Sequence, residues 1–188
     1  MGMESADPEV IRLNDLKCSP EEAMRAIEIV NEYGARRDRG IPKLLPGLNF
    51  LHGLSGESES SFEKNYVFLK SVMERGLLLR RINIRQAVSY ANTKLDQMLK
   101  SPGSESSVPT KKRRPQVLEE RFRYYRDRIR REIDHPMLLL NFPIGTIIRE
   151  VILENSNQGF FLGRPLGSYP VTIKIPNDDE RGAAALTD

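Results

Sequence analysis

Three short stretches in the first half of the chain combine small and polar residues in a way that could bind a ligand. The chain opens with GMESADP, where a carboxylate and a hydroxyl follow a glycine; a loop GLSGES comes later, and INIR then alternates apolar with polar residues. Glycine lets the backbone turn tightly or approach a ligand closely. The candidate ligand-binding residues are Glu4, Ser5, Gly53, Gly56, Glu57, Asn83 and Arg85.

Several of these polar residues also have a purely structural interpretation. Glu4 could be a surface carboxylate beside a helix, Ser5 could begin a turn, and Asp7 before a proline is typical of turn chemistry. Glu57 could bond backbone N–H groups or favour the dipole of the next helix. His52 could contact a ligand, although a histidine packed in the core or at its rim is the more common case.

The spacing of Asn83 and Arg85 favours a role in binding. They alternate with Ile82 and Ile84, so on a strand the two polar side chains share one face. If that face lines the interior of a barrel, the two side chains are polar groups in an otherwise apolar space, and we expect them to touch a ligand. The alternative is a solvated outer face.

A helix is expected just before the loop region. Ser19 precedes a proline at the first helical position, and Glu22 completes a capping box with Ser19. Apolar residues at helical spacing follow, and Gly34 is placed to end the helix. The pattern predicts a helix over residues 19–34.

The same order of elements then repeats. Residues 48–52 are expected to form a short buried strand, Ser60 and Glu63 a second capping box at the start of a helix that ends at Gly76, and residues 77–88 a third strand. Strand end, helix, strand, helix and strand make a run of βα units. This run predicts a parallel sheet with right-handed crossovers.

The second half of the chain has a different composition. Residues 101–115 are rich in Ser and Pro and end in a basic run, which predicts a linker, and residues 116–134 predict a strongly charged helix. Three antiparallel strands are expected next, as the start of a small barrel, within residues 145–154, 160–164 and 167–176. We therefore divide the chain into residues 1–100, 101–115, 116–176 and a disordered tail at 177–188.

Composition limits the class of protein. The 188 residues are 39% hydrophobic and 29% charged, they contain no apolar run long enough to cross a membrane, and Cys18 is the only cysteine. We expect a cytoplasmic protein. Residues 111–132 hold ten Lys or Arg against four Asp or Glu, a local net charge of +6. This segment could bind the phosphates of a nucleic acid through Lys111, Lys112, Arg113 and Arg114, or it could be a solvated linker and helix face.

One stretch, LNFLHGLSGESESSFEKNYVFLKSVMERGL, resembles a late barrel strand and the following helix of radical S-adenosylmethionine enzymes. In that superfamily the strand runs into a Gly-Leu-Pro-Gly-Glu-Thr loop, where this chain has GLSGES with a serine in place of the proline. KLLPGLNF, LLLRRINIRQ, FRYYRDRIRREIDHPML and FPIGTIIREVILE resemble segments of an archaeal group of iron–sulfur oxidoreductases. The C-terminal part of that group is similar to a small TRAM-like β-barrel. The resemblance covers the chain from Gly2 to about Ile175.

The resemblance implies an α/β fold, made of the last βα units of a partial (β/α)6 barrel, followed by a helix and a small antiparallel TRAM-like β segment. It also implies S-adenosylmethionine and a [4Fe–4S] cluster as cofactors, bound at the carboxyl ends of the parallel strands. Glu4 would then accept hydrogen bonds from ribose hydroxyls or from the methionine ammonium.

The chain departs from the family in its cysteines. The superfamily holds its cluster with a CxxxCxxC motif, and a chain whose single cysteine is Cys18 cannot supply three ligands. The chain is therefore interpreted as the C-terminal part of such an enzyme, without the first βα units and inactive alone. A chain that supplies the missing half of the barrel is an expected partner.

Three functions follow from these observations. The first is a part of a radical S-adenosylmethionine enzyme that modifies an unknown substrate, with RNA as the candidate. The second is an RNA-binding module that uses the basic residues 111–131 and the small antiparallel sheet. The third is a fragment without a function of its own.

Overall fold

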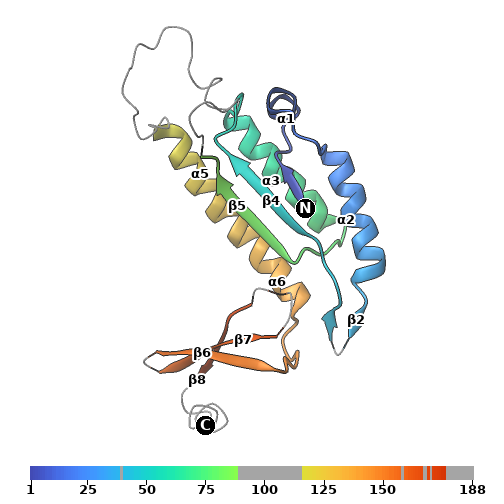
Figure 1. Ribbon diagram of the computed structural model, residues 1–188, viewed down its shortest axis with the longest axis vertical. Coiled ribbons are helices and arrows are strands. Elements are labelled where there is room, and N and C mark those ends of the chain that lie inside the picture. Colours follow the sequence, from blue (N-terminus) through green and yellow to red (C-terminus); the bar gives the residue numbers. More distant parts are fainter. Residues whose placement is uncertain (39, 89–115, 158, 167–168, 170, 177–188) are drawn as a thin grey trace. The chain divides into compact units, whose positions relative to one another are not determined.

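The structure is a computed structural model that divides into two compact units, Met1–Pro143 and Ile144–Asp188 (Figure 1). We describe each unit by itself. The residues described are 1–38, 40–88, 116–157, 159–166, 169 and 171–176. The expected linker at 101–115 and the expected tail at 177–188 lie outside these residues.

The first unit is built on a parallel sheet of three strands. The strands β1 (Gly2–Glu4), β4 (Gly47–His52) and β5 (Arg81–Gln86) lie in the order β1-β4-β5. Between them run α1 (Pro8–Asn14), α2 (Pro20–Gly34) and α3 (Glu59–Glu74). Both strand pairs are parallel, so the predicted run of βα units is confirmed.

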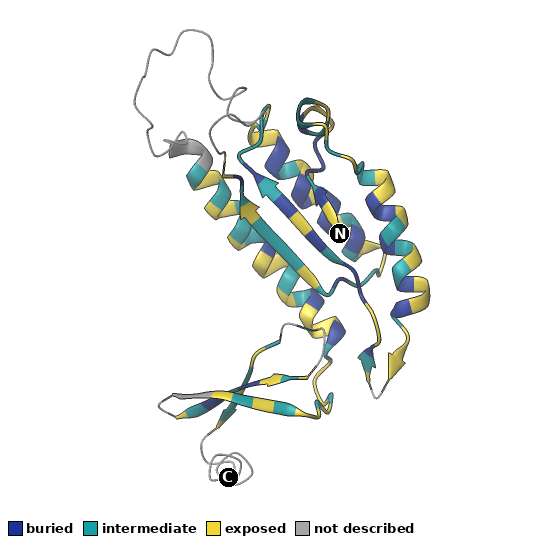
Figure 2. Ribbon diagram, viewed as in Figure 1, coloured by how far each residue is buried: buried dark blue, intermediate teal, exposed yellow. Residues whose placement is uncertain are grey.

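Helices cover one face of this sheet. Leu48 and Phe50 of β4 are buried in one core together with side chains of α2, α3 and the later helices, and Ile82 and Ile84 of β5 pack against the same core. The intervening Asn49 is exposed, and the alternation along β4 is visible in Figure 2. The sheet therefore has an apolar, helix-covered face and a second face that carries polar residues.

The helix expected at 19–34 is present as α2. The Glu22 backbone N–H donates to Ser19 Oγ at 3.2 Å, and the Ser19 backbone N–H donates to Glu22 Oε2 at 2.9 Å, so the predicted capping box is confirmed. Gly34 ends the helix for a different reason from the expected one. Its backbone φ is not positive, but a Cβ there would overlap the backbone of Leu44, which lies against it.

The expected cap of α3, formed by Ser60 and Glu63, is wrong. The helix begins two residues earlier, with Ser58 as its N-cap, and the Ser58 backbone N–H donates to Ser61 Oγ at 3.0 Å. Ser61 also donates to Asp7 Oδ2 at 2.7 Å, so a contact distant in sequence helps to set this helix start.

Two elements of the first unit were not expected from the sequence. One is α1, and the other is a hairpin of β2 (Arg37–Asp38) and β3 (Ile41–Pro42) that turns at Gly40, whose φ is 86°. From this hairpin the Arg37 guanidinium donates to the carbonyl oxygens of Leu140 at 2.6 Å and Asn141 at 3.0 Å. It thereby caps the carboxyl end of a helix 103 residues later.

The predicted helix at 116–134 extends further than expected. It runs as α5 (Gln116–Ile129), a π-helical turn η1 (Arg130–Asp134) and α6 (His135–Asn141). A proline lies at the junction of η1 and α6, where the π-helical turn already interrupts the regular i→i−4 hydrogen-bond pattern. The helix was grouped with the antiparallel strands from the sequence, whereas it belongs to the same compact unit as the parallel sheet and shares its core.

A charged seam joins α5 to α3, with Arg128 at its centre. The Arg128 guanidinium lies 3.6 Å from the centroid of the Tyr66 ring and donates to Glu63 Oε2 at 3.0 Å and Glu132 Oε2 at 3.3 Å. The Tyr66 hydroxyl donates to the same Glu132 oxygen at 2.6 Å, which raises the pKa of Tyr66. The Tyr125 hydroxyl donates to Glu63 at 2.7 Å. The positive charge of Arg128 is therefore used inside the fold.

The second unit is a three-stranded antiparallel meander. The strands β6 (Val151–Asn157), β7 (Phe160–Pro165) and β8 (Ile173–Pro176) lie in sequence order, as predicted. Gly159, with a φ of 90°, makes the first turn. Phe161 is buried, whereas Phe160 is half-buried and carries the Lys174 ammonium 5.1 Å from its ring centroid.

Within the described residues, no helix has the length and apolar character needed to cross a membrane.

Arg128→Met is expected to lower the free energy of unfolding by about 2 kcal/mol, because it removes a cation from an aromatic ring and leaves Glu63 without that partner. Urea unfolding followed by far-UV circular dichroism measures the change. The matched control is Arg123→Met, on the same helix, whose side chain is 69% exposed and lies 3.6 Å from Glu119. That variant should unfold like the parent chain, and equal effects of the two substitutions would contradict the seam.

Candidate functional site

The candidate site lies where the carboxyl ends of the parallel strands meet. Three segments come together there: the turn after β1, the loop 53–58 after β4, and the end of β5. The Ala87 backbone N–H donates to the His52 carbonyl at 2.7 Å, which closes the sheet at this edge. Such an edge is where parallel α/β folds bind ligands.

Glu4 is the last residue of β1 and has a φ of 67°, which is unusual for a residue with a side chain. Its Oε1 lies 3.6 Å from the position a Cβ would take on Gly2. Glu4 pairs with Phe50 after a register shift that follows the Gly2–Asn49 pair, and its carboxylate turns back toward Gly2, whose partner Asn49 is exposed on the polar face of the sheet. The strained backbone therefore turns a half-buried carboxylate toward the open face.

The residues that follow Glu4 build the turn rather than the open face. Ser5 is buried, and its Oγ accepts the Asp7 backbone N–H at 3.1 Å. Asp7 is the N-cap of α1 and accepts the Glu9 backbone N–H at 3.1 Å. The structural interpretation of Asp7 as turn chemistry is confirmed, and the Ser5 hydroxyl is engaged in the same turn.

Asp7 also joins this turn to α3. Its carboxylate accepts hydrogen bonds from Ser61 Oγ at 2.7 Å and from Lys64 Nζ at 2.8 Å. Burial raises the pKa of this carboxyl, but the bonds from Lys64, Ser61 and the Glu9 amide outweigh burial and hold the pKa below its usual value. Beside it, the Ala6 backbone N–H donates to the buried Asn65 Oδ1 at 2.6 Å.

Glu57 holds the loop after β4 in shape. Both of its carboxylate oxygens accept the Gly53 backbone N–H, and Oε1 also lies 3.0 Å from His52 Nδ1. The two side chains are only 4% and 5% exposed. The sequence left two structural roles open for Glu57. The structure has the first of them, in which the carboxylate accepts hydrogen bonds from backbone N–H groups.

The His52 ring is fixed by aromatic contacts. It stacks on Phe62 at 4.4 Å between ring centroids, with an interplanar angle of 7°, and it meets the edge of Phe122 at 5.6 Å. His52 thus packs at the rim of the core and links the loop to α3 and α5. This is the common case for such a histidine.

The rest of the loop is tied to α1. Asn14 Nδ2 donates to the Ser55 carbonyl at 2.9 Å, and the Ser55 backbone N–H donates back to Asn14 Oδ1 at 3.2 Å. Gly56 has a φ of 78°, and a Cβ there would overlap Leu13 Cδ1. The glycines of this loop therefore serve a tight turn packed on α1.

Asn83 and Arg85 lie on the polar face, as predicted from their spacing. The Asn83 side-chain amide donates to Asn49 Oδ1 at 2.7 Å on the neighbouring strand, which leaves its own carbonyl oxygen to accept. Arg85 is exposed, and within the described residues its guanidinium has no ion pair. The polar face thus offers an amide and a guanidinium on the strand whose end borders the candidate site.

The structure separates the sequence candidates into two groups. Glu4, Asn83 and Arg85 present polar groups on the open face, whereas Ser5 and Glu57 use theirs inside the loops. The basic residues 111–114 lie outside the described residues. Sequence reasoning missed the role of Asp7 as a helix cap and as a bridge to α3, although an Asp-Pro pair ahead of an apolar segment is a signal for a helix start.

The iron–sulfur cluster does not fit the residues of this stretch. Three thiolates are required, and the sequence has one cysteine. Cys18 is half-buried against the core, and burial raises the pKa of its thiol, which disfavours the thiolate. Among the described residues, no three His, Cys, Asp or Glu side chains gather closely enough to hold a metal ion.

Asp7→Asn is expected to destabilise the chain by about 2 kcal/mol at pH 7, because the amide cannot accept all the hydrogen bonds that the carboxylate accepts. The folded-state pKa of Asp7 lies below its unfolded value. The ionised group therefore contributes stability above pH of about 4, and this contribution disappears as the pH falls through the folded-state pKa. The difference between parent and variant should shrink on acidification.

Urea unfolding at pH 7 and at two values below pH 4 measures this difference. The control is Glu9→Gln on the same short helix, whose carboxylate forms an exposed ion pair with Arg12. It should leave stability nearly unchanged at every pH. An Asp7→Asn effect that stays constant with pH would contradict the proposed charge of the carboxyl.

No protein-family model matches the chain. An uncharacterized protein of Methanocaldococcus jannaschii is 39% identical to it over 176 residues, which cover 93% of this chain and 30% of that relative. An uncharacterized protein of Archaeoglobus fulgidus is 42% identical over 176 residues, covering 93% of this chain and 31% of that relative. The chain thus spans about three tenths of the length of these curated archaeal relatives.

Proposed function

We propose that the chain is the C-terminal part of the catalytic domain of a radical S-adenosylmethionine enzyme, and that the carboxyl edge of its parallel sheet contributes to the S-adenosylmethionine site. The observation that carries this proposal is the sidedness of the sheet. Helices cover the apolar face, and the open face collects Glu4, Asn83 and Arg85. In an α/β barrel the helices form the outer ring, so the face opposite the helices would be the inner one.

The donor set on the open face suits S-adenosylmethionine. The Glu4 carboxylate can accept hydrogen bonds from an ammonium or from ribose hydroxyls, and the Arg85 guanidinium can bind the methionine carboxylate in bidentate geometry. The Asn83 carbonyl can accept from an adenine amine or a hydroxyl. Asp7 and Glu57 do not touch the ligand in this proposal, but they hold the two loops that surround it.

The iron–sulfur cluster, when bound by the whole enzyme, supplies the electron that cleaves S-adenosylmethionine. This stretch contributes none of its ligands, so the cluster and the radical activity require a separate part of the protein, on the same chain or a partner chain. Reconstituting this chain alone with iron and sulfide should give no stable four-iron absorbance, and a stable one would overturn this assignment. We propose the cytoplasm as the compartment.

A second proposal is RNA binding by the small antiparallel sheet, and one observation favours it. Phe160 and Lys174 share one face of the sheet with Leu162, and the Lys174 ammonium lies over the Phe160 ring. An aromatic ring beside a cation is suited to stacking a base near its phosphate. Phe161 lies on the other face and is buried, so it serves the core.

Titrating the ¹⁵N-labelled chain with S-adenosylmethionine tests the first proposal. We expect saturable shifts of the backbone amides of Glu4–Ala6 and Asn83–Ala87, with α2 unaffected. Glu4→Gln should weaken binding about fivefold, the loss of roughly one charge-assisted hydrogen bond. The control Glu74→Gln, at the far end of α3, removes an exposed carboxylate near Lys70 and should bind like the parent chain.

The absence of shifts at millimolar S-adenosylmethionine, or shifts spread evenly over both units, would contradict the site. Equal affinities of Glu4→Gln and the parent chain would contradict the role of that carboxylate.

A further inference from the structure

The outer edge of β5 is open in the described residues. This strand pairs with β4 on one side, in a parallel register that continues from Gly47↔Arg81 to His52↔Gln86 without a bulge. An edge strand presents a row of unpaired backbone N–H and C=O groups. The regular register leaves this row straight and long enough to pair with another strand.

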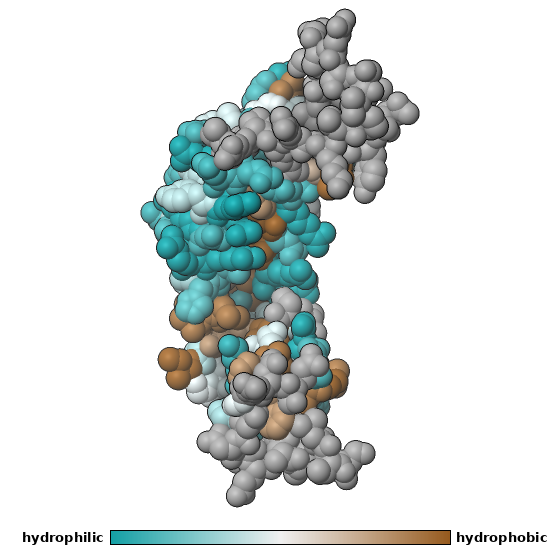
Figure 3. All heavy atoms as spheres, turned by 90° about the vertical axis from the view of Figure 1, so that its left-hand side faces the viewer, coloured by the Kyte–Doolittle hydropathy of each residue, from teal (hydrophilic) through white to brown (hydrophobic). Residues whose placement is uncertain are grey.

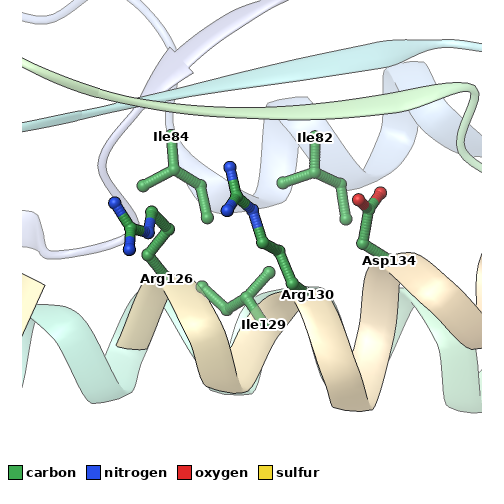
Figure 4. Close-up of a pocket in the computed structure, with 6 residues that line it drawn as sticks. All are labelled: Ile82, Ile84, Arg126, Ile129, Arg130 and Asp134. Carbon is green, nitrogen blue, oxygen red and sulfur yellow. The ribbon is translucent and has the colours of Figure 1, made fainter. Parts of the chain in front are cut away.

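A groove runs beneath this edge, between β5 and the helix of α5 and η1 (Figure 4). Its lining combines apolar and charged side chains: Ile82, Ile84, Arg126, Ile129, Arg130 and Asp134. On the side of the molecule shown in Figure 3, a narrow apolar strip crosses an otherwise hydrophilic surface of the first unit. The π-helical turn that starts at Arg130 forms one wall of the groove.

Arginines lie on both faces of the edge. Arg81 is exposed on the polar face of β5, and Arg130 extends from the helix toward the strand, between Ile82 and Ile84, in Figure 4. Within the part of the chain described here, neither guanidinium forms a hydrogen bond or a close ion pair, although Arg130 interacts electrostatically with the Asp134 carboxylate. The Arg126 guanidinium also faces the groove, although it already forms an ion pair with Asp127 at 3.0 Å and lies over the Phe122 ring.

One carboxylate opposes these cations. Asp134 lines the same groove, four residues beyond Arg130, and would repel a negative group placed beside it. We therefore expect a bound negative group to lie beside Arg126 and Arg130 on the helix side of the edge, or beside Arg81 on its other face. Because both faces of the β5 edge carry arginines, a matching ligand has to carry carboxylates on both of its sides.

An extended polypeptide meets these demands better than a nucleic acid. Its backbone can pair with the N–H and C=O groups of the edge, and its side chains alternate between the two faces. Its apolar side chains can cover the half-buried Ile82 and Ile84 at the groove, where a phosphate would find no partner.

We propose that the open edge of β5 binds an acidic, extended polypeptide segment that adds to the sheet as a further strand, with its carboxylates on Arg81, Arg126 and Arg130.

Fluorescence anisotropy with a labelled peptide of sequence EEVVEEVV, which as a strand carries carboxylates on both faces, tests the proposal on the full chain. Hydrogen exchange of the β5 amides locates the binding. The peptide should bind with an affinity that falls as salt rises, and amides within Arg81–Gln86 should become protected. The counterpart KKVVKKVV should not bind. Binding of both peptides alike would show adhesion to apolar surface and overturn the proposal.

Two variants test the charges in opposite directions. Arg81→Gln combined with Arg130→Gln should weaken peptide binding about fivefold, since each exposed charge pair contributes modestly. Asp134→Asn should strengthen it about twofold by removing the repulsive charge. The control combines Arg25→Gln and Arg123→Gln, two exposed arginines on other helix surfaces, and should bind like the parent.

Three outcomes would overturn the proposal: no binding, binding without protection of β5, or equal affinities of the parent and the Arg81→Gln, Arg130→Gln variant. The first would mean that the arginines only guard the edge against pairing. A polyuridine oligonucleotide provides the remaining comparison. If it displaces the peptide and binds the same edge more tightly, the edge is a nucleic-acid site and the polypeptide proposal fails.

Discussion

The burial of a single face of the parallel sheet is the constraint on which the first unit depends. Crossover helices usually cover both faces of a parallel sheet, and its strands are then hydrophobic throughout. Here the strands alternate instead: Leu48 and Phe50 face the helices, and Asn49 between them does not. Ile82 and Asn83 divide in the same way on β5. The sequence of each strand is thus adapted to a sheet whose second face meets polar groups or a ligand.

A sheet covered on one side has to hold the loops at its edge by other means. Buried polar contacts do this here: Asp7 ties the first turn to Ser61 and Lys64, and Glu57 closes its own loop on the Gly53 amide. These carboxylates are saturated with hydrogen bonds from the protein. Glu4 differs, because its backbone is strained and its side chain faces outward. A carboxylate whose oxygens already accept hydrogen bonds from the loops therefore has a structural role, whereas a carboxylate without such bonds is available to bind a ligand.

Local signals predicted most of the elements and the face of β5. The capping box of Ser19 with Glu22 and the alternation of Ile82 with Asn83 depend only on neighbours in the chain, and both are confirmed. The start of α3 was misplaced because Ser61 bonds Asp7, 54 residues earlier, and no local pattern records such a contact. The roles of Ser5 and Glu57 were ambiguous for the same reason, since their partners are backbone amides placed by the fold.

The charged helix shows most clearly what composition leaves open. Its arginines looked alike in the sequence, as one basic surface. Residues two apart on a helix point to nearly opposite sides, so Arg128 and Arg130 meet different surroundings. Arg128 enters the seam with Tyr66 and Glu63, where its charge is neutralised and serves the packing of α5. Arg130 faces the groove below β5, where the charge beside it is that of Asp134. The net charge of this segment counts both arginines alike. Only the positions of their side chains around the helix show that one packs in the seam and the other faces the groove.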